Sequence, residues 1–239
     1  MKKLFFTLSF LFLLGSGAMA QGLNLVNPSL DKANKYFDAG RYKEAIAEYS
    51  KTIYIEPTFM QAYNNRGLAK LEMNDYTGAL SDFNKVISKE PKNAEAYRNR
   101  ATLKIRKQDY AGALADYDKA VALGADDADA YFNRGIAKVA MNKRREALSD
   151  FDKSITLKPD AVDSYVERGF TRMDVGDASG ALTDFNQAIK LNPKSATAYY
   201  GRGATQVALK NKSAACSDLQ KAAQMGSPEA RSLQAKTCK

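Results

Sequence analysis

The chain has 239 residues, of which 45% are hydrophobic, and its 36 Lys and Arg against 27 Asp and Glu give a formal net charge of +9. Its length would suit one or two ordinary domains. The sequence contains no histidine, which removes the commonest general base and the Ser-His and Cys-His pairs that activate nucleophiles. Composition therefore argues against an enzyme, and we expect no catalytic residues, no metal site and no cofactor.

Residues 1–20 have the three parts of a secretory signal peptide: a positive start at Lys2 and Lys3, an apolar run over 4–14 and a small-residue cleavage site that ends at Ala20. A membrane anchor is the alternative, but a spanning helix needs roughly 20 apolar residues. We expect cleavage after Ala20, leaving a chain that does not span the membrane. A bacterium would export it to the periplasm or the medium. Basic proteins often bind nucleic acid, but export makes us expect no such partner here.

From Tyr63 onward, one short pattern recurs every 34 residues without insertion or deletion. The five copies are YNNRGLAK from Tyr63, YRNRATLK from Tyr97, YFNRGIAK from Tyr131, YVERGFTR from Tyr165 and YYGRGATQ from Tyr199. Such a period indicates one supersecondary unit stacked on copies of itself. It predicts the units 26–59, 60–93, 94–127, 128–161, 162–195 and 196–229. A stack of this kind points to a binding surface rather than a single catalytic cleft.

Each unit is expected to form two amphipathic helices, because apolar residues recur at three- and four-residue spacing in both halves. In unit 60–93 the helices would span about 60–73 and 77–89, with a turn at Asn74-Asp75. Small residues share one place on the first helices, namely Gly67, Ala101, Gly135, Gly169 and Gly203. Large residues share one place on the second helices, namely Tyr49, Phe83, Tyr117, Phe151, Phe185 and Leu219. Glycine inside a helix costs about 1 kcal/mol relative to alanine, so its recurrence predicts close helix packing.

The pattern Tyr131, Gly135, Ala147, Phe151 and Pro159 resembles the tetratricopeptide repeat. The resemblance covers about 26–229, although the first unit agrees well only in its second half. It implies an all-α protein, a right-handed α-solenoid of six antiparallel helix pairs over 21–229, with residues 230–239 as a short C-terminal capping helix. It also implies that the first helices line a concave groove that binds peptides or partner helices.

Two charged columns recur with the repeat, and we expect their members to pair. The basic column is Arg66, Arg100, Arg134, Arg168 and Arg202. The acidic column, sixteen residues later each time, is Asp82, Asp116, Asp150, Asp184 and Asp218. An anion-binding ladder is the functional alternative. Because guanidinium and carboxylate groups that recur together are suited to bidentate pairing, we interpret the columns as part of the scaffold.

The resemblance places the residues one and five positions after each opening tyrosine on the concave side. There the first half of the groove is polar and the second half apolar, which suits a partner's amphipathic helix or extended segment. An asparagine column could hydrogen-bond a peptide backbone. The candidate partner-binding residues are Asn65, Asn99, Phe132, Asn133, Ile136, Val166, Phe170 and Tyr200. Packing of these apolar side chains against one another is the alternative. The acids Glu95, Asp129 and Asp163 argue against capture of an acidic C-terminus.

Cys216 and Cys238 are the two cysteines of the chain and lie equally far on either side of Ser227. A helical hairpin that turned at Ser227 would bring them together. In an exported protein with two cysteines we expect a disulfide, which would hold the end of the last repeat. A metal pair is disfavoured without histidine, and the spacing is not that of a C-x-x-C redox motif.

These observations favour a non-catalytic, exported scaffold or adaptor that binds a protein or peptide partner in its groove. A module that binds a cell-envelope glycan is the alternative, although the groove has no tryptophan and few aromatic residues spaced for sugar stacking.

Overall fold

The computed structural model describes residues 28–239, so the predicted signal peptide and its cleavage site lie outside the described residues. Over 28–239 the chain forms α-helices joined by turns, and this part contains no strand. The predicted all-α solenoid fold is confirmed. The chain divides into two compact parts, Met1–Leu103 and Lys104–Lys239. Each is larger than one 34-residue repeat. From here on they are called the first unit and the second unit, and each is described by itself.

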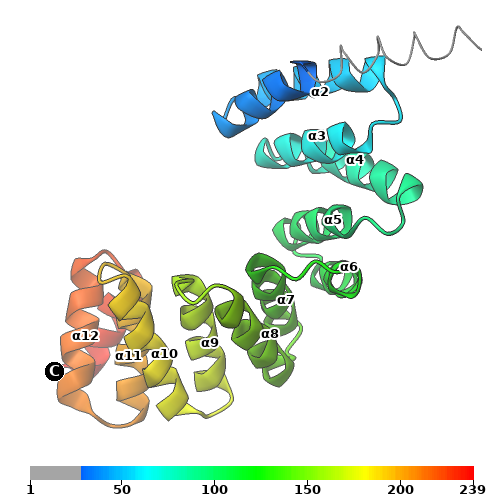
Figure 1. Ribbon diagram of the computed structural model, residues 1–239. Helices are drawn as coiled ribbons and strands as arrows, with labels where there is room; N and C mark the ends of the chain where they lie inside the picture. The colour runs from blue at the N-terminus through cyan, green and yellow to red at the C-terminus, as the bar shows by residue number, and fades with distance from the viewer. Residues whose placement is uncertain (1–27) are drawn as a thin grey trace, which may run out of the picture. The chain divides into compact units, whose positions relative to one another are not determined.

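In the first unit a helix over 28–38 is followed by α2 (Tyr42–Ile55), α3 (Met60–Glu72), α4 (Tyr76–Lys89) and the start of α5 (Ala94–Arg106). Figure 1 shows these helices folding back on one another in chain order. Consecutive helices pack together, as α2 does on α3 and α3 on α4. The aromatic side chains of Tyr49 and Phe83 are buried between them.

The second unit continues with α6 (Tyr110–Ala122), α7 (Ala128–Ala140), α8 (Arg144–Leu157), α9 (Val162–Asp174), α10 (Ala178–Leu191), α11 (Ala196–Ala208), α12 (Lys212–Gln224) and α13 (Pro228–Thr237). Each helix packs on the next. The first helices of successive pairs also touch, since α9 contacts both α7 and α11. The expected C-terminal capping helix is α13, which packs against α12 and α11 with Ala230 buried.

Several helices begin at a residue whose side chain caps the first turn. The Asp75 side chain accepts a hydrogen bond from the Gly78 backbone N–H at the start of α4, and Asp109 and Asp177 do the same for α6 and α10. Such caps satisfy backbone donors that have no partner inside the helix. The first helices of the pairs, α3, α5, α7, α9 and α11, begin at 60, 94, 128, 162 and 196, which are 34 residues apart.

The first and second helices of a pair approach closely at the repeated glycines. A Cβ atom on Gly67 would lie 2.6 Å from Cε1 of Phe83, and one on Gly135 would lie 2.7 Å from Cε1 of Phe151. Only a residue without a side chain fits at that distance. The small-against-large pattern of the sequence is therefore the packing of each helix pair.

No helix within 28–239 is both long enough and apolar enough to cross a membrane.

Candidate partner-binding surface

The repeated arginines bind the aspartates that follow them on the next helix. Arg66 donates from Nε and Nη2 to the two carboxylate oxygens of Asp82, at 2.9 and 2.7 Å. Three pairs of the second unit share this geometry, with Nη2–Oδ1 distances of 2.6, 2.6 and 2.7 Å for Arg134–Asp150, Arg168–Asp184 and Arg202–Asp218. The hydrogen bond with Asp218 raises the pKa of Arg202, against the burial that lowers it. Arg100 lies in the part of the chain that ends at Leu103 and Asp116 in the part that begins at Lys104, and their pairing stays a prediction.

Each of these arginines has two further contacts that the sequence analysis missed. Its Nη1 group donates to a polar residue on the preceding second helix, sixteen positions earlier in the chain. These bonds are Arg66–Ser50 at 3.0 Å, Arg100–Asn84 at 2.7 Å, Arg134–Asp118 at 3.1 Å, Arg168–Asp152 at 2.6 Å and Arg202–Asn186 at 2.7 Å. The guanidinium also lies over the ring of the tyrosine three residues before it, with centroid distances from 5.2 Å at Arg134 to 5.6 Å at Arg168.

Several aspartates of the acidic column bind two cations each. Lys70, Lys138 and Arg172 each place a second cation on the same carboxylate as the arginine four residues earlier, at 2.7, 2.8 and 2.9 Å. These carboxylates are almost fully buried, between 1% and 3% exposed for Asp82, Asp150 and Asp184, and buried charges persist only when paired. The columns therefore join neighbouring helix pairs. Their guanidinium groups already form hydrogen bonds within the protein, and so they do not form a row of unpaired cations for an anionic ligand.

Asn65 lies in a hollow of the first unit. Asn34, Phe37, Asp38, Tyr49 and Leu68 line this cavity with it, and its volume is about 330 Å³. The Tyr49 hydroxyl and the Asn65 amide both donate to Oδ1 of Asn34, at 2.7 and 3.3 Å. Burial raises the pKa of Tyr49 to about 12, so its hydroxyl remains a donor at neutral pH. Amide and hydroxyl groups line the hollow together with the apolar side chains of Phe37 and Leu68 and the carboxylate of Asp38, and no repeated pattern in the sequence points to Asn34.

The other two asparagines of the column lie in different surroundings. The Asn99 amide donates to Oδ1 of Asn64 at 2.9 Å, and Asn99 is only 5% exposed. The Asn133 amide donates to the backbone carbonyl of Asp129 at 2.9 Å and lies at the surface. Asn99 thus offers little area to a partner, whereas Asn65 and Asn133 are accessible.

The predicted apolar strip lies on the first helices of the second unit and is partly packed on itself. The Phe132 ring lies 6.0 Å from that of Phe151, and the Phe170 ring lies 5.0 Å from that of Phe185 and 6.2 Å from that of Tyr200. Val166 is 5% exposed, and so it contributes to the core rather than to a contact surface. Phe132, Ile136, Phe170 and Tyr200 are half-buried, which leaves their edges available to a partner.

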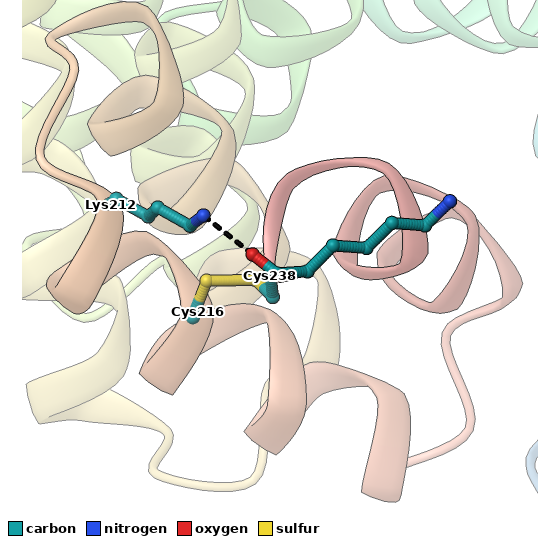
Figure 2. Close-up of a disulfide and its surroundings, with 4 residues drawn as sticks. Lys212, Cys216 and Cys238 are labelled. Carbon is teal, nitrogen blue, oxygen red and sulfur yellow. Dashed lines mark hydrogen bonds between the residues drawn. A yellow bond between two sulfur atoms is a disulfide. The ribbon is translucent and has the colours of Figure 1, made fainter.

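Cys216 on α12 and Cys238 after α13 lie side by side with their sulfur atoms 2.01 Å apart, as in a disulfide (Figure 2). Beside them the Lys212 ammonium donates to the backbone carbonyl of Lys239 at 2.7 Å. Both contacts hold the end of α13 to α12. Within residues 28–239, no group of three or more His, Cys, Asp or Glu side chains could hold a metal ion.

The chain matches a family model described as TPR repeat over residues 33–74 and 171–210, and two described as tetratricopeptide repeat over residues 64–130 and 128–161. These matches fall on the paired helices just described. The chain belongs to the tetratricopeptide-repeat family. No curated protein sequence matches it.

Solved structures with the same fold include several repeat proteins. PilF from Pseudomonas aeruginosa has a TM-score of 0.80 at 16% identity, covering 90% of this chain and 99% of that one. YrrB, described as a TPR protein with an unusual peptide-binding site, has a TM-score of 0.70 at 22% identity, covering 79% and 97%. A tetratricopeptide repeat protein from Parabacteroides merdae has a TM-score of 0.61 at 22% identity, covering 90% and 84%. At these identities the likeness concerns the fold alone.

Proposed function

We propose that the protein is an exported, non-catalytic scaffold that binds a protein or peptide partner along its first helices. The observation that carries this proposal is the half-buried strip of Phe132, Ile136, Phe170 and Tyr200. Rigid surfaces with accessible apolar edges are typical of protein interaction sites. The description of YrrB as having a peptide-binding site supports this use of the fold. Separately, in the first unit, the hollow at Asn65 has amide groups that suit a peptide backbone.

The absence of catalysis is part of the proposal and rests on the sequence. A chain without histidine lacks the usual proton-transfer group, and repeat proteins of this family are typically scaffolds. The paired arginines and aspartates of the charged columns act as links between helices, which is a structural role.

Two features support export. Residues 1–20 have the composition of a signal peptide, and the sulfur atoms of Cys216 and Cys238 lie at disulfide distance, a bond that is typical of proteins in oxidising compartments. Mass spectrometry of the protein from fractionated native cells tests this. We expect a chain that begins at Gln21 and carries an oxidised cysteine pair in the periplasm or the medium. A cytoplasmic protein that retains Met1 and free thiols would contradict export.

The function itself is tested by crosslinking the tagged protein in its native cells, followed by mass spectrometry. We compare the wild type with the double variant Phe132→Glu with Phe170→Glu, after circular dichroism has shown that helicity is intact. The matched control is Leu157→Glu with Met225→Glu, which changes two apolar residues that are 38% and 37% exposed outside the strip. A partner lost only by the strip variant supports the proposal.

Two results would contradict this assignment. A partner retained by both variants would move the interface to another face. Recovery of no protein partner would make binding of an envelope glycan the next hypothesis to test.

A further inference from the structure

In the second unit, the first helix of a pair carries acidic side chains near its start. These acids have no arginine neighbour, whereas the equivalent acid of the first unit does. In the first unit Glu95 lies 4.0 Å from Arg98 and also accepts a hydrogen bond from Asn64 at 3.1 Å. Asp129 and Asp163 occupy the place of Glu95 in the next two repeats, but Phe132 and Val166 replace Arg98. Among residues 28–239, no Lys or Arg forms an ion pair with either carboxylate.

These acids line a hollow next to the apolar strip. Asp129 and Phe132 of α7 and Asp163 of α9 border a cavity of about 310 Å³. The hydroxyls of Ser154 and Ser164, 2.9 Å apart and buried, also line it. Lys158 and Asp160 complete its edge, so the carboxylates there outnumber the cations. The hollow is therefore polar and acidic where it adjoins the Phe132 ring.

A third acid continues this surface along α9. Glu167 lies one turn after Asp163 and is half-buried, and burial together with the charge of Asp163 raises the pKa of its carboxyl. No cation of the described chain pairs with it. Like charges four residues apart destabilise a helix, so the placement of Asp163 and Glu167 does not serve the stability of the free protein.

Partly exposed aromatic side chains lie next to these acids. Phe170 lies one turn after Glu167 on α9, and its ring lies 6.2 Å from that of Tyr200 on α11. We name this combined surface the acidic-aromatic face. It consists of Asp129, Phe132, Asp163, Glu167, Phe170 and Tyr200.

We infer that the acidic-aromatic face docks a basic amphipathic segment of a protein partner. Lysine or arginine side chains of the segment would lie on Asp129, Asp163 and Glu167, and its apolar side chains on Phe132, Phe170 and Tyr200. The inference rests on the proposed function and adds the chemistry of the partner. It follows from charge complementarity, because a bound cation would supply what Arg98 supplies to Glu95 in the first unit. An acidic segment would be repelled by the same carboxylates.

The net charge of the chain makes this selectivity informative. A chain with a formal charge of +9 attracts acidic peptides in general. Preference for a basic peptide would therefore have to come from a local surface such as the acidic-aromatic face.

The test measures fluorescence anisotropy of labelled peptides titrated with the purified chain. One peptide carries Lys and Leu in alternating pairs, a second has Glu in place of each Lys, and a third has Ser in place of each Leu. We expect the Lys-Leu peptide to bind most tightly. Its affinity should fall about tenfold in Asp163→Asn with Glu167→Gln, since each lost ion pair at a partly exposed site contributes severalfold. Added salt should weaken binding in the wild type more than in this variant.

The control Glu146→Gln removes an exposed acid in the first turn of α8 that is not part of the acidic-aromatic face, and should leave the affinity unchanged. The carboxamide variant should also unfold at a temperature no lower than the wild type, which separates lost binding from lost folding. Failure of the Lys-Leu peptide to bind would overturn the inference, as would unchanged affinity in the carboxamide variant. If the Glu-Leu peptide binds instead, and Phe132→Glu with Phe170→Glu abolishes that binding, the inference fails while the proposed function stands.

Discussion

Arg134 shows how one side chain can hold three helices. It contacts both carboxylate oxygens of Asp150 on α8, donates to Asp118 on α6 and lies over the Tyr131 ring of its own helix α7. A guanidinium can do this because its donors lie in one plane and point in several directions. Lysine, with a single ammonium, cannot reproduce the arrangement even though it retains the charge.

We therefore expect Arg134→Lys to lower the free energy of unfolding by about 1–2 kcal/mol, because hydrogen bonds to buried charged groups contribute on that scale. Urea denaturation followed by circular dichroism measures the change. Arg144→Lys is the control, because the side chains of Arg144 and Asp174 are 35% and 50% exposed. This substitution should lower the free energy of unfolding by less than about 1 kcal/mol. Equal losses in the two variants would mean that the repeated column contributes no more than a surface ion pair.

Glu167 should make stability depend on pH in a definite direction. Burial raises the pKa of its carboxyl above the ordinary value of 4.5, and the charge of Asp163 adds to this. The folded chain therefore holds the proton more tightly than the unfolded chain does. The resulting stabilisation is complete below the unfolded pKa and is lost as the pH rises through the folded one.

We expect Glu167→Gln to match the wild type in acid and to become the more stable of the two as the pH rises from about 4 to about 7. Urea midpoints measured across that range test this. Glu146→Gln on α8 should show no such divergence. A Glu167→Gln variant that lost stability at neutral pH would show that the carboxylate has a stabilising partner.

At the scale of helices, the repeated glycines set the distance between the two members of a pair. A Cβ atom on Gly135 would lie 2.7 Å from the rigid ring of Phe151, which is fully buried. A Cβ atom on Gly203 would lie 3.0 Å from Cγ of Leu219, a less severe contact with a side chain that is also fully buried but can change its rotamer.

Gly135→Ala should therefore destabilise the protein by about 1–2 kcal/mol through overpacking. Gly203→Ala should be close to neutral, because the helix propensity of alanine offsets the tighter contact. Thermal unfolding of the two variants gives the comparison. Similar losses at both sites would indicate that the Leu219 side chain is as fixed as the Phe151 ring.

Helix α8 begins without a side-chain cap. Its N-cap is Lys143, followed by Arg144 and Arg145 in the first turn and Glu146 at the third position. Cations are unfavourable at the positive end of the helix dipole. Lys143→Asp would supply the cap that Asp75, Asp109 and Asp177 supply to the equivalent helices.

We expect Lys143→Asp to raise the free energy of unfolding by about 1 kcal/mol, the usual contribution of an aspartate cap. Asp75→Ala on α4 should lower it by a similar amount. Chemical denaturation of both variants tests the pair. A Lys143→Asp variant without added stability would show that the helix start is already satisfied by solvent.

Periodicity explains why the helices could be predicted closely while the surface could not. The fixed spacing of Tyr63 and its equivalents places the first helices, because every repeat must meet an identical neighbour. The pairing of Arg66 with Asp82 on the following helix is predictable for the same reason. The contact with Ser50 is predictable too, because polar residues recur at its position in the later repeats, namely Asn84, Asp118, Asp152 and Asn186. By contrast, burial of Asn99 and Val166 depends on contacts between side chains that occur once, so no repeat pattern reveals it. The hollow at Asn34 arises from the atypical first repeat and gave no periodic signal.

At the scale of the molecule, stability is a sum of contacts between neighbouring repeats, so an end repeat lacks half of its support. The C-terminal end compensates in two ways. Helix α13 covers the cluster of Tyr199, Leu219 and Ala222, and the Cys216–Cys238 disulfide closes a loop with a sequence separation of 22 residues (Figure 2). A crosslink over such a loop stabilises by about 3 kcal/mol on the chain-entropy account.

Replacing both cysteines with serine should therefore loosen the end of the chain selectively. Amide hydrogen exchange should accelerate over α13 and the last turns of α12, whereas residues 28–103 should keep their protection because repeats contact only their neighbours. Adding a reductant to the wild type should reproduce the effect, which controls for the serine side chains. Unchanged protection of α13 in both experiments would show that apolar packing on Leu219 is sufficient to hold the end. Faster exchange across the whole described chain would show instead that unfolding is cooperative beyond nearest neighbours.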